Sequence, residues 1–446
     1  MRGFTTKTES EETMSRKRAV SGFHSSKFRT LGWKGSVLIL VFLGAVLCCS
    51  SPARGGDPAQ KPKVRAITAF IRIDRANYKA QIANTLEMLH QAKTAFERGG
   101  YQVESVRITT QPFPEYVRGL KKEEALAFFR AYGDLAGQEH FAANIGPAML
   151  HDTDDPSAAQ LLGEVLSDTK NLNASLVVAG EDGIHWKSIQ AAAKLIKFVE
   201  MHTPHSQGTF NFTATAMLAP YAPFFPGSYH TGEGHQFSVA WEAANLVDEV
   251  FAGTGSNVQL AAERLKKAFA EHALETDTIA REVEKQCGWT YMGLDASPAP
   301  SRQVSIGAGI EKFLGAKIGS SGTMTAAALI TQAIRSIPVK KVGYSGLMLP
   351  VLEDGLLAQR WSEGTYNIDS VLAYSAVCGT GIDTIPLPGD ISEEQLARMI
   401  GDMATLAVKW HKPLSARLQP VAGKKPGDRT EFTDSSLVNT TIQPLQ

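Results

Sequence analysis

The chain has 446 residues, of which 43% are apolar and 20% are charged, and its formal net charge is zero. These values are typical of a globular protein that buries a sizeable core, and they exclude a collagen-like or a strongly charged disordered chain. Because the charge is balanced, we expect no electrostatic attraction to nucleic acid or to an anionic membrane surface.

The N-terminal segment, residues 1–53, has the pattern of a targeting sequence. Basic residues between Arg16 and Lys34 precede an unbroken apolar run over 37–49, and the small residues Ser51 and Ala53 follow. An apolar run of about thirteen residues is short for a bilayer span and typical of a secretory signal. We therefore expect a cleaved signal peptide and a periplasmic or extracellular protein. An uncleaved membrane anchor and a start codon assigned too early are the alternatives.

Cleavage after Ala53 would leave two cysteines, Cys287 and Cys378. They could form a disulfide in an oxidising compartment, but the sequence does not show whether their Cα atoms are close enough. No Cys and His spacing typical of a structural zinc site occurs. We therefore expect no metal, and the sequence identifies no cofactor.

After a polar linker over 54–63, the pattern is that of an α/β domain. Residues 64–73 alternate as a strand does, an amphipathic helix follows and stops at Gly99-Gly100, and residues 103–109 alternate again. Further along, we expect a strand at 174–179 and helices at 187–202, 238–252, 257–286, 323–337 and from Ser392 to Pro413. This alternation predicts a largely parallel sheet. Residues 428–446 are expected to be a polar tail.

Cys378 is the first candidate site residue. It follows an apolar, strand-like run and opens the turn Gly379-Thr380-Gly381. Backbone amides in such a turn can hold an anion or lower the pKa of a thiol, which would suit a nucleophile. The alternative is an inert core cysteine, which most unpaired cysteines are.

Three acidic residues in the same region are candidate acid–base or ligand-binding groups. Asp383 follows the Gly-rich turn, and Glu353 and Asp354 end the apolar run 349–352. Carboxylates at the end of a buried strand suit proton transfer or metal binding. The alternative for Asp383 is a turn-capping side chain, and for Asp354 it is the N-cap of a following helix.

His230 is a further candidate because it ends a Pro- and aromatic-rich loop that begins at Tyr221. Ordered loops of this length are usually functional. Its neighbours Glu233 and His235 do not have the spacing of a helical zinc motif. A histidine that is hydrogen-bonded within the loop is the alternative to a ligand or an acid–base role.

Arg417 lies in an alternating apolar run, and a buried Arg is costly unless it is paired. It would either pair with Asp383 or Glu353, or clamp a substrate carboxylate.

A Gly- and Ser-rich turn before a helix is a candidate anion site. Its residues Ser320, Ser321, Gly322 and Thr323 would present backbone amides to phosphate or carboxylate. The turn lacks the Lys of a P-loop, and a tight turn against a neighbouring strand is the alternative. Asp295 is a candidate for the wall of a site or for a capping role.

Several long motifs resemble one known family. They are Phe224–His230, Gly293–Pro300, Gly322–Ala328, Gly343–Asp354, Tyr374–Asp390 and Lys412–Arg417. Over residues 64–427, the chain resembles the DUF711 (UPF0210) family. The resemblance implies a ten-stranded α/β barrel like that of pyruvate formate-lyase and other glycyl radical enzymes. It also implies that Cys378 lies in or near the barrel, where those enzymes carry their active thiol.

The chain departs from the radical enzymes, because it has no Arg-Val-x-Gly-type motif near its C-terminus and no cysteine beside Cys378. We therefore expect a non-radical enzyme that acts on a small carboxylate-bearing metabolite. The expected catalytic residues are Cys378, Asp383, Glu353 and His230, and the expected substrate-binding residues are Arg417, Ser320, Ser321, Gly322, Thr323, Asp354 and Asp295. An exported small-molecule binding protein without turnover is the alternative, and a metal site at the His230 loop is a third hypothesis.

Overall fold

The computed structural model describes residues 60–301 and 303–445. The expected targeting segment and most of the linker lie outside these residues, so export and membrane anchoring remain predictions. In the part of the chain that the structure describes, no helix combines the length and apolarity that a bilayer span requires.

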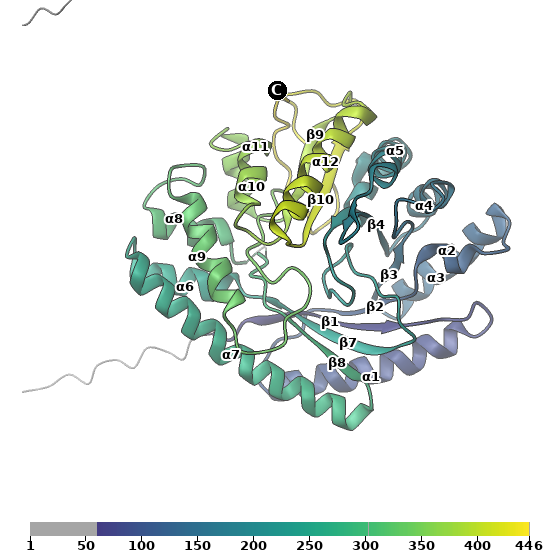
Figure 1. Cartoon of the computed structure of the whole chain (residues 1–446), viewed down its shortest axis with the longest axis horizontal. Helices are drawn as coiled ribbons and strands as arrows, with labels where there is room; N and C mark the ends of the chain where they lie inside the picture. The colour runs from purple at the N-terminus through teal and green to yellow at the C-terminus, as the bar shows by residue number, and fades with distance from the viewer. Residues whose placement is uncertain (1–59, 302, 446) are drawn as a thin grey trace, which may run out of the picture. The chain divides into compact units, whose positions relative to one another are not determined.

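One ten-stranded sheet forms the centre of the fold (Figure 1). Its strands follow the order β8-β7-β1-β2-β3-β4-β6-β10-β9, and β5 pairs with β4. They are β1 (Lys63–Ile71), β2 (Val106–Thr109), β3 (Ala142–Pro147), β4 (Leu172–Gly180), β5 (Gly183–Ile184), β6 (Phe212–Ala216), β7 (Gly234–Glu242), β8 (Thr290–Asp295), β9 (Gly381–Pro388) and β10 (Leu414–Val421).

The sheet contains parallel strands that run in two opposite directions. β1, β2, β3, β4 and β6 pair in parallel. The parallel pairs β7–β8 and β9–β10 meet this block antiparallel, at β1 and at β6. The α/β class is therefore confirmed, but the sheet is mixed rather than uniformly parallel.

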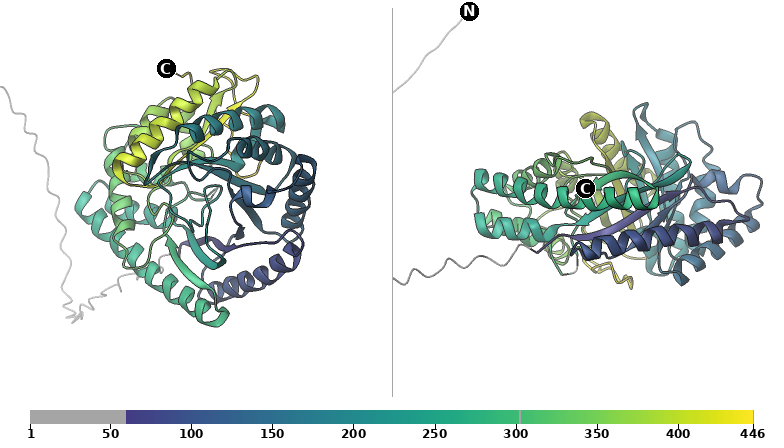
Figure 2. Two further views of the ribbon diagram at one scale, coloured as in Figure 1. Left: turned by 45° about the vertical axis from the view of Figure 1, so that its right-hand side comes forward. Right: turned by 90° about the horizontal axis from the view of Figure 1, so that it is seen from below.

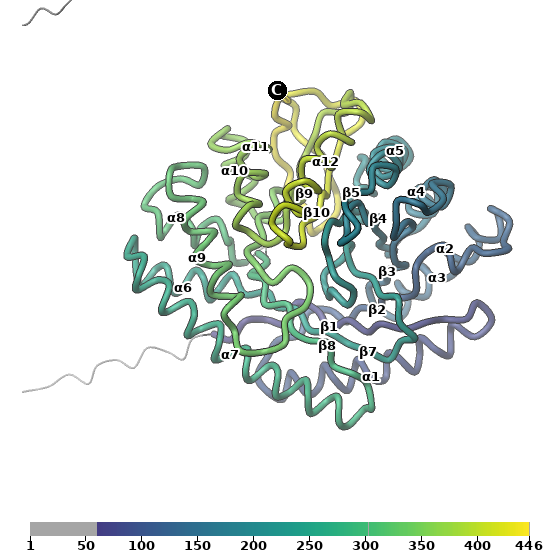
Figure 3. Tube along the Cα trace, in the orientation of Figure 1, coloured from purple at the N-terminus to yellow at the C-terminus, as the bar shows by residue number. Residues whose placement is uncertain are grey.

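The expected closed barrel is not confirmed, because hydrogen bonds between strands do not close the sheet. Among the described residues, the edge strands β8 and β9 do not pair with each other. Residues 340–354, here called the inner segment, lie between them. The Leu294 amide of β8 donates to Lys340 O at 2.9 Å, and the Val351 amide donates to Asp383 O of β9 at 3.2 Å. Figure 3 traces this segment between α9 and α10.

Helices surround the curved sheet on its outer side (Figure 2). They are α1 (Tyr78–Arg98), α2 (Phe113–Val117), α3 (Lys122–Gln138), α4 (Ser157–Asp168), α5 (Trp186–His202), the 3-10 helix η1 (Pro204–Asn211), α6 (Ala244–Thr254), α7 (Val258–Cys287), α8 (Ile306–Leu314), α9 (Thr323–Arg335), α10 (Gly355–Ser362), α11 (Ile368–Tyr374) and α12 (Glu393–Trp410). Their buried apolar stripes, such as that of α12, pack on the sheet and form the main core.

Irregular segments cover the inner side of the sheet. Phe224 of the loop that ends at His230, and Leu218 just before that loop, pack with Tyr344 and Met348 of the inner segment in a separate buried cluster. Four alanines, Ala66 and Ala240 on the strands and Ala222 and Ala299 on loops, complete this cluster. Small side chains on the strands leave space on this side for the segments that shape a cavity.

Two local predictions are wrong. Residues 234–242 form the strand β7 rather than the start of a helix over 238–252, and α6 begins only at Ala244. A short buried apolar run is compatible with the period of a helix and with that of a strand. Here the run pairs with β1 and is therefore a strand. The apolar run before Cys378 is the helix α11 and a turn, not a strand.

Residues 428–445, expected to be a polar tail, fold back onto the domain. Phe432, Leu437 and Ile442 are buried against Leu352 and Val421. The Val438 amide donates to Leu352 O at 2.7 Å. These spaced apolar residues, together with buried hydrogen bonds such as that from Thr440 Oγ1 to Ala358 O at 2.6 Å, hold the segment on the domain.

Candidate functional site

A cavity of about 860 Å³ opens on the inner side of the sheet. Arg65, Arg107, Asn173 and Thr213 line it from near the amino ends of β1, β2, β4 and β6. Ala299, which follows the carboxyl end of β8, lines it from the block that runs in the opposite direction. Because the two blocks are antiparallel, the amino ends of strands in one block lie beside the carboxyl ends of strands in the other, and both contribute side chains to the cavity. In a uniformly parallel sheet, the site usually lies at the carboxyl ends of the strands alone.

Glu353 is the centre of an ion-pair network in this cavity. Its Oε1 lies 2.7 Å from Nη1 of Arg417, and its Oε2 lies 3.7 Å from Nη2 of Arg65. Arg65 also contacts Glu242, with 2.7 Å between Nη1 and Oε2. Burial alone would lower the pKa of Arg65. The nearby carboxylates of Glu353 and Glu242 have the larger combined effect, so the pKa of Arg65 is raised above its ordinary value.

Backbone and aromatic contacts hold Arg417 in place. Its Nε and Nη2 donate to Phe210 O at 3.1 and 3.0 Å, and its guanidinium carbon lies 4.0 Å from the centre of the Phe210 ring. With the ion pair to Glu353, these contacts satisfy most of its donors. Arg417 therefore mainly organises the site, and its charge faces Asp383 as well.

An irregularity in β9 brings Asp383 to Arg417. Ala416 pairs with Ile382 and Leu418 pairs with Ile385, so the single residue between them faces both Asp383 and Thr384. Thr384 has a φ of 49°, which is unusual for a β-branched residue. Such bulges redirect side chains beside functional sites. Asp383 Oδ1 lies 3.5 Å from Arg417 Nη1 and has no hydrogen-bond partner among the described residues.

The protonation of Asp383 should be visible in the pH dependence of stability. Burial raises the pKa of Asp383 to about 6 although Arg417 lowers it, so protonation favours the folded state. This stabilisation is complete below about pH 4 and is lost as the pH rises through about 6. Between about pH 5 and pH 7.5, the free energy of unfolding should fall by about 1 kcal/mol more in the wild type than in Asp383→Asn.

Urea denaturation at each pH measures this difference. Asp390→Asn changes an exposed Asp and should follow the wild type. Identical pH dependence in the wild type and Asp383→Asn would contradict the raised pKa.

Arg107 differs from the other two cavity arginines, because no carboxylate of the described residues lies within 4.0 Å of it. Its Nε donates to Ser105 Oγ at 3.1 Å, and its guanidinium carbon lies 5.1 Å from the centre of the Phe225 ring. Burial and the nearby charge of Arg65 lower its pKa to about 9. Its terminal nitrogens make no hydrogen bond within residues 60–301 and 303–445, so they are available to a ligand.

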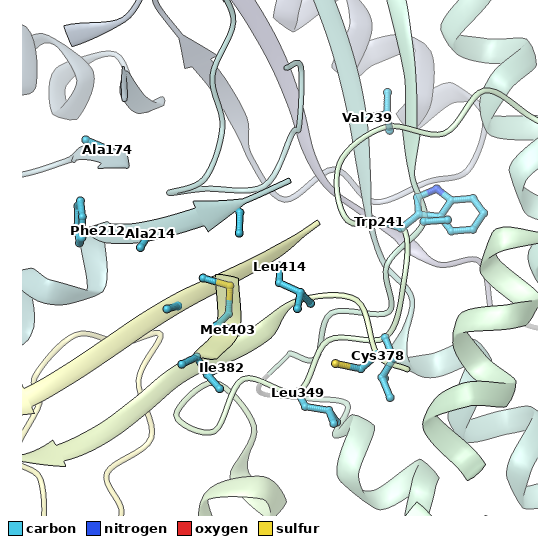
Figure 4. Close-up of a cluster of buried hydrophobic side chains, with 14 of the residues drawn as sticks. Ala174, Phe212, Ala214, Val239, Trp241, Leu349, Cys378, Ile382, Met403 and Leu414 are labelled. Carbon is cyan, nitrogen blue, oxygen red and sulfur yellow. The ribbon is translucent and has the colours of Figure 1, made fainter. Parts of the chain in front are cut away.

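Cys378 is fully buried in the core and is not among the residues that line the cavity (Figure 4). Lys412 Nζ donates to the carbonyls of Cys378 and Ser375, and burial lowers the pKa of this amine to about 8. The Gly379 amide donates to Leu347 O at 2.6 Å, and a Cβ on Gly379 would lie 2.5 Å from the backbone of Gly346. Two glycines thus allow this turn to approach the inner segment closely. Cys287 and Cys378 are both free, so they do not pair.

His230 lies apart from the cavity. Its Nε2 is 2.8 Å from Ile71 O, and its ring packs against Phe70 and Tyr221. Burial lowers its pKa, so the neutral form is favoured. Within the described ranges, no three His, Cys, Asp or Glu side chains group closely enough to hold a metal ion.

Asp295 and Asp354 are buried and hold other segments. Asp295 accepts hydrogen bonds from the amides of Tyr344 and Ser345 at 2.7 and 3.1 Å, and so fixes the start of the inner segment. Asp354 caps α10 through Leu356 and Leu357, and it also accepts from the first amides of α8. Neither residue lines the cavity.

The Gly- and Ser-rich turn lies at the start of α9 and does not line the cavity. Thr323 Oγ1 donates to Ser320 O at 2.8 Å, and Ser321 is exposed. A Cβ on Gly319 would lie 2.0 Å from Thr365 O, so the turn packs closely against the loop after α10. Ser320, Ser321, Gly322 and Thr323 are not cavity residues.

The structure therefore brings together three of the predicted site residues, Glu353, Asp383 and Arg417. The sequence patterns did not identify Arg65 and Arg107 as site residues, because both lie in segments that were expected to be strands. Each interrupts an apolar run at a strand start, and that pattern was the available signal.

Fold and cavity define a mixed α/β protein with an internal site rich in arginine and carboxylate groups. A family model described as "Uncharacterised ACR (DUF711)" matches residues 58–435, so the chain belongs to this family. The resemblance inferred from the motifs is thereby confirmed.

Relatives in archaea show the same family. A UPF0210 protein of Pyrobaculum aerophilum is 32% identical over 357 residues, which cover 74% of this chain and 76% of the relative. A UPF0210 protein of Methanocaldococcus jannaschii is 24% identical over 381 residues, which cover 80% of this chain and 83% of that protein.

Among solved structures, the anaerobic ribonucleotide reductase from Thermotoga maritima in complex with dATP and CTP is similar at a TM-score of 0.41 and 8% identity. The similarity covers 84% of this chain and 79% of the reductase chain. Similarity at this level is no basis for transferring chemistry.

Proposed function

We propose that the cavity binds a small anionic metabolite, with Arg107 as its anchor. The observation that carries this proposal is the half-buried guanidinium of Arg107, which has no carboxylate partner while Arg65 and Arg417 both have one. A buried cation is costly unless it is paired, and a ligand carboxylate or phosphate would supply the missing charge. The volume of the cavity is in the range of small-molecule sites.

We further propose that the protein is a non-radical enzyme in which Asp383 transfers a proton. Its pKa of about 6 lies close to neutral pH, where a carboxyl group serves as either acid or base. Glu353 is already engaged by two arginines, so its role is to fix them.

A binding protein without turnover is the alternative. The position of Cys378 favours it, because this fully buried thiol does not reach the cavity and so offers no nucleophile there. Chemistry at Cys378 would need the inner segment to move away from the Gly379 turn.

A thermal-shift and titration screen tests the anion site. Small carboxylates and phosphates should include compounds that stabilise the wild type, and the shift grows with ligand concentration over its dissociation constant. Arg107→Gln should weaken binding of the best compound by roughly 10- to 100-fold, since hydrogen bonds to a charged group contribute about 1.5–3 kcal/mol.

Arg118→Gln is the matched control, because Arg118 is exposed and does not line the cavity. It should bind as the wild type does. Equal affinity in Arg107→Gln, or no stabilisation by any anion, would overturn the proposal.

A further inference from the structure

A second part of the cavity has buried polar atoms without partners. Oδ1 of Asp383 and Oγ1 of Thr380 make no hydrogen bond within the described residues, and both side chains line the cavity. The two residues are only 7% and 3% exposed. Buried polar groups without partners cost free energy, so each of these two atoms indicates a missing hydrogen-bonding group.

The charges around these atoms restrict what that group is. Asp383 is an acceptor, so the missing group must donate a hydrogen bond. An ammonium bound to Oδ1 would lie close to the Arg417 guanidinium, whose Nη1 is 3.5 Å from the same oxygen. Beside a carboxylate that is only 7% exposed, two cations at that separation repel strongly. A neutral hydroxyl donates to Asp383 without this cost and accepts from Thr380.

The Tyr344 side chain supports the same conclusion. It lines the cavity beside Gly227, where an added Cβ would lie 2.6 Å from the phenol oxygen. Burial raises its pKa, so the phenol stays protonated and is a neutral partner for a hydroxyl. The backbone amide of Tyr344 donates to Asp295, so the backbone at this side of the cavity is held in a fixed position.

We propose that the ligand is a small hydroxylated anion, such as a hydroxy acid or a hydroxylated phosphate ester. Its anionic group binds Arg107, and its hydroxyl donates to Asp383 and accepts from Thr380. This assignment rests on the proposed anion site and adds the second recognition element to it. It excludes simple fatty acids and disfavours amino acids as ligands.

Titration calorimetry with matched compounds tests this inference. The pairs are lactate and propionate, malate and succinate, and glycerol 3-phosphate and propyl phosphate; alanine replaces the hydroxyl of lactate by an ammonium. In at least one pair, the hydroxylated member should bind at least about tenfold more tightly. The compound without the hydroxyl leaves the buried polar atoms of the site without a hydrogen-bond partner, which costs binding free energy. The series that shows the preference identifies the anion as carboxylate or phosphate.

Two variants localise the preference. Asp383→Ala and Thr380→Val should each reduce it to about twofold or less while the deoxy compound binds as before. Asp390→Ala, an exposed Asp outside the cavity, should keep it. Unfolding curves show whether each variant is folded.

The outcomes separate the two proposals. Equal binding within every pair, lost in Arg107→Gln, would overturn the hydroxyl assignment and leave the anion site standing. Tighter binding of alanine than lactate would also overturn it. No binding by any compound would overturn both.

Discussion

Asp295→Ala is expected to lower the free energy of unfolding by about 3–5 kcal/mol. Asp295 is fully buried, and its carboxyl group accepts hydrogen bonds from the Ser297 hydroxyl at 2.5 Å and from the Tyr344 amide at 2.7 Å. It also accepts from the amides of Ser297 and Ser345, both at 3.1 Å. Replacement by Ala leaves these donors unpaired in the interior, where each costs a desolvation penalty.

Urea denaturation measures the loss. Asp248→Ala is the matched control, because Asp248 pairs with Lys312 near the surface and such a pair contributes at most about 1 kcal/mol. A loss of less than about 1 kcal/mol in Asp295→Ala would show that the inner segment does not depend on this residue.

The same variant should also weaken ligand binding, although Asp295 does not line the cavity. Gly343 has a φ of 65°, and a Cβ there would lie 2.1 Å from Asp295 Oδ2, so the carboxyl group is packed directly on the turn that leads into Tyr344. Asp295 thus acts through the position of Tyr344. This explains why a long motif around Asp295 can suggest a site residue when its contacts are those of a scaffold.

The sequence predicted the fold class because strand and helix periods are local properties. It also predicted Glu353, Asp383 and Arg417 as a group, since carboxylates and an arginine in apolar runs must find partners when buried. Arg417 indeed pairs with Glu353, one of the two partners that the sequence suggested.

Long-range geometry decided the rest. Arg65 reaches the cavity at an irregularity of β1, where Val64 pairs with Trp241 and Ala66 pairs with Ala240. The position of Arg107 depends on the parallel register of β1 and β2. Local periodicity in the sequence does not determine either register. Cys378 is the opposite case: a Gly-rich turn beside a thiol suggests reactivity in the sequence, whereas in the structure the thiol is fully buried and does not line the cavity.

A double-mutant cycle on Glu353 and Arg417 is expected to give a coupling energy of about 1.5–3 kcal/mol. The two side chains are 12% and 10% exposed, and 2.7 Å separates their charged atoms. Glu353→Gln leaves Arg417 with only the more distant Asp383, and Arg417→Met leaves Glu353 with Arg65 at 3.7 Å. Each single variant should lose about 3 kcal/mol or more, because it leaves a buried charge poorly paired.

The double variant should lose much less than the sum of the two, since it removes both charges at once. The exposed pair Lys312–Asp248, treated in the same way, should show a coupling below about 1 kcal/mol. If the Glu353 and Arg417 effects instead add to within about 0.5 kcal/mol, the network does not act as a unit. The contact of Arg417 with Glu353 would then contribute little energy, and Arg417 would be a candidate ligand anchor beside Arg107.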